Sequence, residues 1–147
     1  MLLPKQLIPR IEQNIKAKHA EVISKATRAM IEHIEIPAKI NLLKNVDSGN
    51  LWSHTTTTVV ENGDETEIVT GAPFSYGLYL DQGTGIYQLD GKGRKTPWFW
   101  EIRTRKWSRI LNKKPGSLQW TRGQKPTRWL SQPWAEHKNK VLDDILR

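Results

Sequence analysis

The sequence predicts an α+β fold, in which a long N-terminal helix and a C-terminal helix pack on a small antiparallel sheet, with a long basic, tryptophan-rich loop. An apolar stripe at helical spacing runs through residues 5–34, and a second helical pattern closes the chain. Between them, two β-branched runs flank an Asn62-Gly63 pair. With 147 residues, 37% of them hydrophobic, the chain is expected to form a single domain over residues 1–147.

The N-terminal helix is predicted from apolar residues that recur at helical steps. They are Ile8, Ile11, Ile15, Val22, Ala26 and Met30. A stripe of this kind usually faces the core. Pro37 is expected to end the helix, because the residue before a proline avoids helical backbone angles. A short second helix is expected over residues 38–46, followed by a turn at residues 47–50, and Trp52 is expected to dock on the core.

Residues 55–70 predict an antiparallel β-hairpin. Thr55 to Val60 and Glu67 to Thr70 are rich in β-branched residues, and Asn62-Gly63 between them is a strong hairpin signal. Threonines on both faces indicate a half-exposed pair of strands. An exposed edge of this hairpin is a place where another subunit could add strands.

Residues Ala72 to Gly85 form the densest apolar and aromatic segment. Pro73 suits a first helical turn, and Gly83 and Gly85 favour a sharp exit. The segment therefore predicts a short buried helix. The chain closes with another helix within residues 126–146, with Pro133 in its first turn, Ser131 or Gln132 as the cap, and one face shared by three residues: Trp134, Val141 and Ile145.

Residues 86–118 are predicted as a long flexible or interface loop. A loop of this length in a small domain is usually functional or disordered, but four aromatic residues within ten positions argue against disorder. A β-ribbon, in which residues 97–102 return near residues 117–121, is an alternative.

Positive charge is concentrated in one stretch. The net charge is +8, yet residues 1–90 carry 8 Lys and Arg against 11 Asp and Glu, whereas residues 91–128 carry 12 against 1. A localised excess of this kind indicates a partner surface or a mobile loop.

No catalytic or metal-binding pattern is found in the sequence, so an enzyme is not predicted and no cofactor is expected. The chain has no cysteine, and none of its four histidines forms a pair at metal-binding helical spacing. The glycine-rich segments at 83–85 and 91–93 lack the remaining residues of a phosphate-binding loop. No apolar run has the length that a membrane span needs, so no membrane partner is expected.

The basic aromatic stretch has two interpretations. As a subunit interface, its anchors would be four aromatic side chains: Trp98, Phe99, Trp100 and Trp107. Trp52, outside the stretch, and the hairpin edge would belong to the same interface. As a nucleic-acid groove, its phosphate contacts would be Arg94, Lys95, Arg103, Arg105, Lys106 and Arg109. Because no nucleic-acid-binding fold motif is present, the interface is favoured over specific nucleic-acid binding.

Three segments resemble motifs of the tailed-phage head–tail joining, or tail-completion (neck), proteins. The family signature Tyr-Ala-x-Tyr-Val-Glu-aromatic-Gly-Thr is similar to residues 76–84, with Asp81 in place of Glu and Gln82 in place of an aromatic residue. Residues 48–53 resemble the Thr-Gly-x-Leu-x-x-Ser turn. Residues 125–134 resemble the x-Pro-x-x-Phe-Leu-x-Pro-Ala start of the C-terminal helix, with Trp129 and Trp134 as departures. The signature residues carried over as structural are Tyr76, Tyr79, Asp81, Gly83, Thr84, Pro126, Trp129 and Leu130.

The resemblance implies a single neck-protein-like domain that assembles into a closed ring. Its partners would be further copies of itself, the head connector or portal-side protein, and the tail tube protein, with only weak contact to passing DNA. The protein would be made in the host cytoplasm and reside in the virion. The alternative function is a non-sequence-specific nucleic-acid-binding protein that uses residues 91–128.

Overall fold

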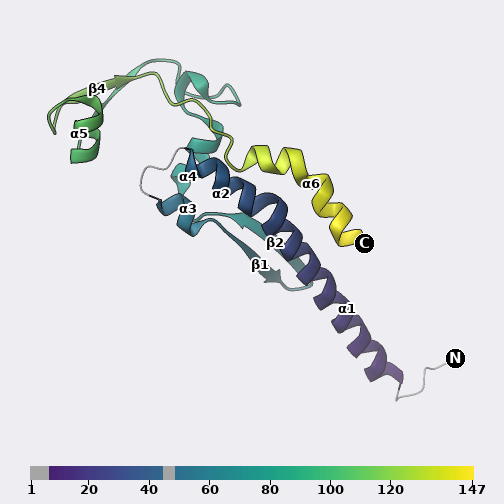
Figure 1. The fold of residues 1–147 in the computed structure, drawn as a ribbon. Helices are drawn as coiled ribbons and strands as arrows, with labels where there is room; N and C mark the ends of the chain where they lie inside the picture. The colour runs from purple at the N-terminus through teal and green to yellow at the C-terminus, as the bar shows by residue number, and fades with distance from the viewer. Residues whose placement is uncertain (1–6, 45–48) are drawn as a thin grey trace. The chain divides into compact units, whose positions relative to one another are not determined.

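The computed structural model describes residues 7–44 and 49–147, and it confirms the α+β class (Figure 1). The sequence predicts one domain over residues 1–147, and within this range the structure distinguishes two compact units. Unit 1 comprises the described residues of Met1–Pro73 together with Trp129–Arg147, and unit 2 comprises Phe74–Arg128.

Unit 1 begins with a long helical segment that continues through a proline. Helix α1 (Leu7–Met30) runs into a π-helical turn, η1 (Ile31–Glu35), and then into α2 (Ile36–Leu43). The prediction that Pro37 ends the helix is therefore wrong. Pro37 lies in the first turn of α2, and the wider π-helical hydrogen bond from the Ile36 N–H to the Ile31 carbonyl precedes it. The altered register accommodates a residue that donates no backbone hydrogen bond. The short helix predicted over residues 38–46 corresponds to α2, and its last two residues lie outside the described part.

The apolar stripe of α1 is buried only at its C-terminal end. Ala26 and Met30 are buried, but the four stripe residues before them are exposed, with Ile15 at 63%. The expectation that the whole stripe faces the core is wrong, because the other elements of unit 1 pack against the later part of the helical segment. The core there comprises Ala29, Met30, Ile34 and Val141, with Ile68, Leu130 and Ile145 packed around them.

The predicted hairpin is confirmed as β1 (Thr56–Asn62) and β2 (Glu65–Gly71), which pair antiparallel with Val59 opposite Ile68. The turn falls at Gly63-Asp64, where Gly63 has a φ of 63° that favours glycine. Ile68 packs on the core. The face that carries Ile68 therefore points inward, and the opposite face is turned to solvent.

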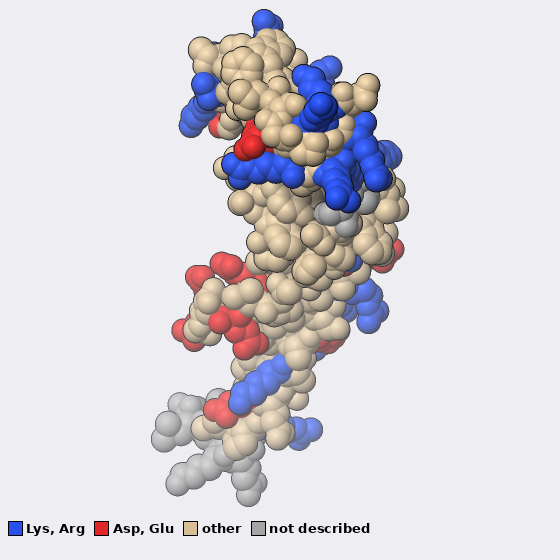
Figure 2. Space-filling view, turned by 90° about the vertical axis from the view of Figure 1, so that its left-hand side faces the viewer, with Lys and Arg blue, Asp and Glu red and all other residues tan. Residues whose placement is uncertain are grey.

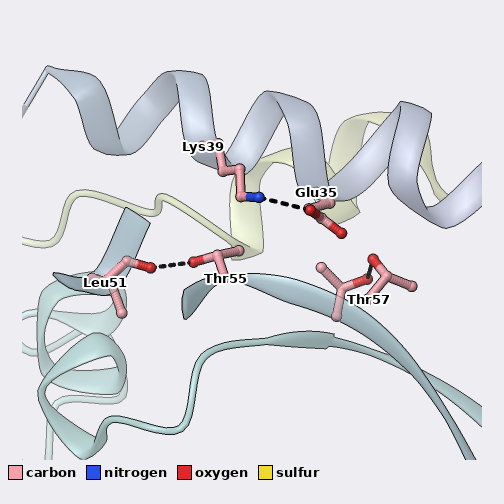
Figure 3. Close-up of polar contacts among 6 residues, drawn as sticks. Glu35, Lys39, Leu51, Thr55 and Thr57 are labelled. Atoms are coloured by element: carbon pink, nitrogen blue, oxygen red, sulfur yellow. Dashed lines mark hydrogen bonds and ion pairs between the residues drawn. The ribbon is translucent and has the colours of Figure 1, made fainter. Parts of the chain in front are cut away.

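Helix α3 (Asn50–His54) precedes the hairpin, and Trp52 on it is 41% exposed. The prediction that Trp52 docks on the core is wrong, because the buried residue of this short helix is Leu51. The Lys39 ammonium lies 5.7 Å from the centroid of the Trp52 ring. Thr55, fully buried, donates its hydroxyl hydrogen to the Leu51 carbonyl at 2.6 Å (Figure 3). Of the predicted turn at residues 47–50, the first two residues lie outside the described part.

Helix α6 (Ser131–Leu146) closes unit 1, and Pro133 lies in its first turn as predicted. The residue at the N-cap position is Leu130, so neither predicted cap residue occupies it. On the predicted shared face, Val141 is buried and Ile145 packs on the core, whereas Trp134 is exposed. His33 Nε2 on η1 lies 2.8 Å from the Oδ2 carboxylate oxygen of Asp144 on α6. This contact links the two helices.

Unit 2 begins with α4 (Ser75–Gln82), which ends at Gly83 as the sequence predicts. The prediction that this helix is buried is wrong for its aromatic residues, since Tyr79 is 56% exposed and Tyr76 is also exposed. The buried residues of α4 are Gly77 and Asp81, which lie four positions apart and therefore share one helix face. The tyrosines lie off that face.

The stretch predicted as a long loop contains ordered elements. They are η2 (Gly85–Tyr87), β3 (Trp98–Glu101), α5 (Arg105–Leu111) and β4 (Leu118–Thr121). Strands β3 and β4 pair antiparallel, so the β-ribbon considered as an alternative is present, and α5 lies between its strands in the chain.

Candidate interaction surface

The β3–β4 ribbon has two faces of different character. Phe99 lies opposite Trp120, and Glu101 lies opposite Leu118. Directly opposed residues in a sheet point to the same side. These four side chains therefore form one face, called the exposed ribbon face below. The other face carries Trp98, Trp100, Gln119 and Thr121, all partly buried.

The half-buried face packs against helix α5 through Trp100 and Trp107. The Trp107 ring on α5 meets the Trp100 ring edge-on, with centroids 5.8 Å apart and an interplanar angle of 80°. The Thr104 hydroxyl accepts the Trp107 N–H at 3.4 Å and caps the helix. Ile102, just after β3, is fully buried. These contacts make Trp100 and Trp107 part of the packing of unit 2.

The exposed ribbon face presents apolar rings and two cations. Phe99 is 65% exposed, and Trp120 and Leu118 are also exposed. The Arg122 guanidinium lies over the Trp120 ring at 5.3 Å from its centroid. At the other end, the Arg103 Nε donates to the Glu101 carboxylate at 3.2 Å. Exposed apolar groups of this kind are typical of interaction surfaces.

The base of the ribbon is fixed by the Gly83-Thr84-Gly85 tripeptide. The Thr84 N–H donates to the Gln124 carbonyl at 2.9 Å, and the Gln124 N–H donates to the Thr84 hydroxyl at 2.9 Å. A Cβ on Gly85 would lie 2.0 Å from the Arg122 carbonyl oxygen, and one on Gly123 would lie 2.0 Å from the Thr84 carbonyl oxygen. Both sites therefore require glycine, because the two backbones run in direct contact. This contact gives Thr84 and Gly85 a structural role at the base of the ribbon.

Positive charge is concentrated in unit 2. Residues 74–128 carry 12 Lys and Arg against 3 Asp and Glu, a formal charge of +9. Figure 2 shows Lys and Arg side chains gathered over one part of the molecule and Asp and Glu over another. All six basic residues proposed from the sequence are exposed: Arg94, Lys95, Arg103, Arg105, Lys106 and Arg109.

The β1–β2 hairpin has the opposite sign. No Lys or Arg occurs between residues 45 and 91. Glu65 and Glu67 lie opposite Asn62 and Val60 on the solvent-facing side of the hairpin, called the outer hairpin face below. Val60 and Val69 on this side are exposed. The face thus combines apolar area with carboxylates.

The aromatic anchors proposed from the sequence are divided by the structure. Phe99 is on the exposed ribbon face, Trp98 and Trp100 are on the half-buried face, and Trp107 packs against Trp100. Trp52 is exposed on α3 in unit 1. The interface role of these five residues stays a prediction.

The family-signature residues have mixed environments. Asp81 and Trp129 are buried, at 6% and 3% exposure. Leu130 packs on the core of unit 1. Pro126 lies beside Gly83, where its ring would be 2.9 Å from an added Cβ. Tyr76 and Tyr79 are exposed.

Three residues of this surface, Leu118, Trp120 and Arg122, are not among the site residues predicted from the sequence. The sequence does carry a signal for them, because residues 118–121 alternate apolar and polar side chains and fall in the returning strand of the alternative ribbon. The residue that lies opposite Phe99 can be identified only when the register of β3 and β4 is known. That register depends on the length of the insertion between the two strands.

Glu35 supplies the clearest electrostatic link within unit 1. Its carboxylate accepts a hydrogen bond from the Lys39 ammonium at 2.8 Å and lies near Thr57 on β1 (Figure 3). Burial raises the pKa of Glu35, but the hydrogen bonds from Lys39 and Thr57 outweigh this effect, so its pKa lies below the usual value of 4.5. The Glu35–Thr57 contact joins the helical segment to the hairpin.

Among residues 7–44 and 49–147, no group of three or more His, Asp or Glu side chains is arranged to hold a metal ion. In the same described ranges, no helix is long and apolar enough to cross a membrane. Comparisons with protein-family models, curated proteins and solved structures found no match to this chain.

Proposed function

We propose that the protein is a structural component of a tailed-phage virion or prophage, which joins the head connector to the tail as a ring of identical copies and completes the tail. It makes and breaks no covalent bond. Its partners would be further copies of itself, the connector or portal-side protein, and the tail tube protein.

The observation that carries this proposal is the amount of apolar surface the single chain leaves exposed in separate places. The N-terminal part of the α1 stripe, the outer hairpin face and the exposed ribbon face all present large apolar side chains. Contiguous exposed apolar groups rimmed by polar residues are typical of protein–protein contacts. Several such surfaces on one chain fit a protein that contacts copies and neighbours simultaneously.

The order of the elements gives further support. A long helix, a turn, two strands, the signature helix, an extended insertion and a C-terminal helix follow one another as the resemblance implies. The motif at residues 48–53 ends at Ser53 within α3. Gly83 of the signature at residues 76–84 ends α4. The third motif leads into α6.

A second candidate function is non-specific nucleic-acid binding by unit 2. Its formal charge of +9 and the exposed Phe99 and Trp120 rings, one of them beside Arg122, supply phosphate neutralisation and base stacking.

One experiment separates the two functions. The purified chain is examined by sedimentation velocity over a concentration series, and its affinity for labelled single-stranded and duplex DNA is measured by fluorescence anisotropy at increasing salt. A structural ring protein is expected to form discrete assemblies and to bind DNA weakly. A monomer that binds DNA strongly, with affinity falling steeply as salt rises, would instead support the nucleic-acid function.

A further inference from the structure

We infer that the outer hairpin face of one copy docks on the exposed ribbon face of a second copy. The inference rests on the proposed function, because it names the contact through which copies would join. Both faces belong to two-stranded sheets, both expose apolar side chains, and their charges have opposite signs.

The outer hairpin face supplies two valines and two carboxylates. Val60 lies opposite Glu67, Val69 lies opposite Thr58, and Glu65 continues the same face toward the turn. All of these side chains are exposed. The nearest basic residues in the chain are Lys44 and Lys92, so no Lys or Arg within the hairpin neutralises the carboxylates.

The exposed ribbon face supplies the complementary set. Phe99 and Trp120 lie directly opposite each other across the strands, and Leu118 extends the apolar area. Arg122 lies over the Trp120 ring, and Arg103 is held beside Glu101 at the other end. Valine side chains pack well against aromatic rings. Guanidinium groups form bidentate hydrogen bonds with carboxylates.

The chemistry of the ribbon face favours a protein partner over nucleic acid. Leu118 offers no ring on which a base could stack, and its exposed aliphatic side chain fits an apolar protein surface. The outer hairpin face supplies such a surface through Val60 and Val69.

The contact joins two different patches, and each copy carries both. It is therefore heterologous, and its repetition builds a ring or a filament rather than a closed symmetric dimer. In both sheets the described strands pair only with each other, so the outer edges also remain available to a neighbour.

A charge-swap experiment tests this contact in the intact chain. The acidic variant set is Glu65→Lys with Glu67→Lys, and the basic variant set is Arg103→Glu with Arg122→Glu. Each variant alone would present like charges at the contact, whereas an equimolar mixture restores opposite charges at every contact. A control with the same charge change, Glu12→Lys with Glu32→Lys, alters exposed residues of α1 and η1. Thermal unfolding monitors folding of each variant.

The expected result is that each charge-swapped variant self-associates about a hundredfold more weakly than the wild type at about 0.1 M salt. The mixture regains wild-type assembly, and the control behaves as the wild type. Assembly that is unaffected by the swaps, or not regained on mixing, overturns the hairpin–ribbon contact and leaves the structural function standing. A wild-type chain that stays monomeric at every concentration overturns both. If a double variant unfolds, Glu67→Gln and Arg122→Gln replace it and are expected to reduce the salt dependence of assembly.

Discussion

Phe99 and Trp120 lie directly opposite each other on β3 and β4, and both side chains are exposed on the same face of the ribbon. Their neighbours Trp98 and Trp100 point to the other face, where Trp100 contacts Trp107. The alternation of a strand thus separates aromatic residues that hold unit 2 together from aromatic residues that are available to a partner.

The exposed pair is expected to serve assembly rather than folding. Changing Phe99→Ser and Trp120→Ser should leave the melting temperature nearly unchanged, because neither ring is buried in the chain. The same variant should lose self-association, measured by light scattering after size-exclusion chromatography. Unfolding far below the wild-type temperature would show instead that the rings are part of the intradomain core.

Trp100→Ala changes a tryptophan on the other face of the ribbon and is expected to affect folding. The ring is half-buried against Trp107, so its removal should destabilise unit 2 by about 1–3 kcal/mol, somewhat less than for a fully buried ring. Urea unfolding followed by tryptophan fluorescence measures the loss. A stability equal to that of the wild type would mean that the Trp100–Trp107 contact contributes nothing to the fold.

Gly85→Ala is expected to disrupt the base of the ribbon. The glycine has a φ of +61°, and an added Cβ would lie 2.0 Å from the Arg122 carbonyl oxygen, so the two backbones must separate. Gly91 is the control, because it has a φ of +71° but open space around it. Gly91→Ala should cost only the backbone strain, about 1–2 kcal/mol. Hydrogen exchange of the unit 2 amides should increase strongly in the first variant, and equal exchange in both variants would contradict this account.

Glu35 is expected to make unit 1 sensitive to acid. Because its pKa in the folded protein is lowered below 4.5, its contribution to stability is present above that pH and is lost as the pH falls through the lower, folded-state value. Glu35→Gln should reduce stability near neutral pH by about 1 kcal/mol and flatten the acid dependence. Urea unfolding at several pH values measures both effects, and an unchanged acid slope in the variant would disprove the assignment to Glu35.

Two isoleucines of the helical segment are expected to differ sharply. Ile34 is buried in the core of unit 1, and Ile34→Ala should cost about 2–5 kcal/mol. Ile15 is 63% exposed, and Ile15→Ala should change the unfolding free energy of the monomer little. Chemical denaturation of both variants at low protein concentration provides the comparison, and equal losses would mean that the α1 stripe is buried along its whole length.

The elements of the fold were largely predictable because their signals are local. The helical stripe, the Asn62-Gly63 turn and Pro133 in a first turn each depend on neighbours in the chain. Pro37 was misjudged because a π-helical turn before it is not visible in residue preferences. A proline stops a regular α-helix, and a local change of register removes this restriction.

Burial was predicted less well, because it depends on what packs against an element. Tyr79 lies in the most apolar segment of the chain, yet the buried positions of α4 are Gly77 and Asp81. Tyr79→Ala should therefore cost little, not the loss typical of a core residue. The exposed ribbon face was only half foreseen: Phe99 was identified, but its partner Trp120 follows from a strand register that single-residue patterns do not contain.

The most direct test of the central claim is the mass of the purified 147-residue chain, measured by sedimentation velocity over a concentration series with and without duplex DNA. The account predicts discrete species heavier than a monomer, whose formation does not require DNA and is lost when Phe99 and Trp120 are replaced by serine. A chain that remains monomeric at every concentration, and sediments as a complex only with DNA, would contradict it.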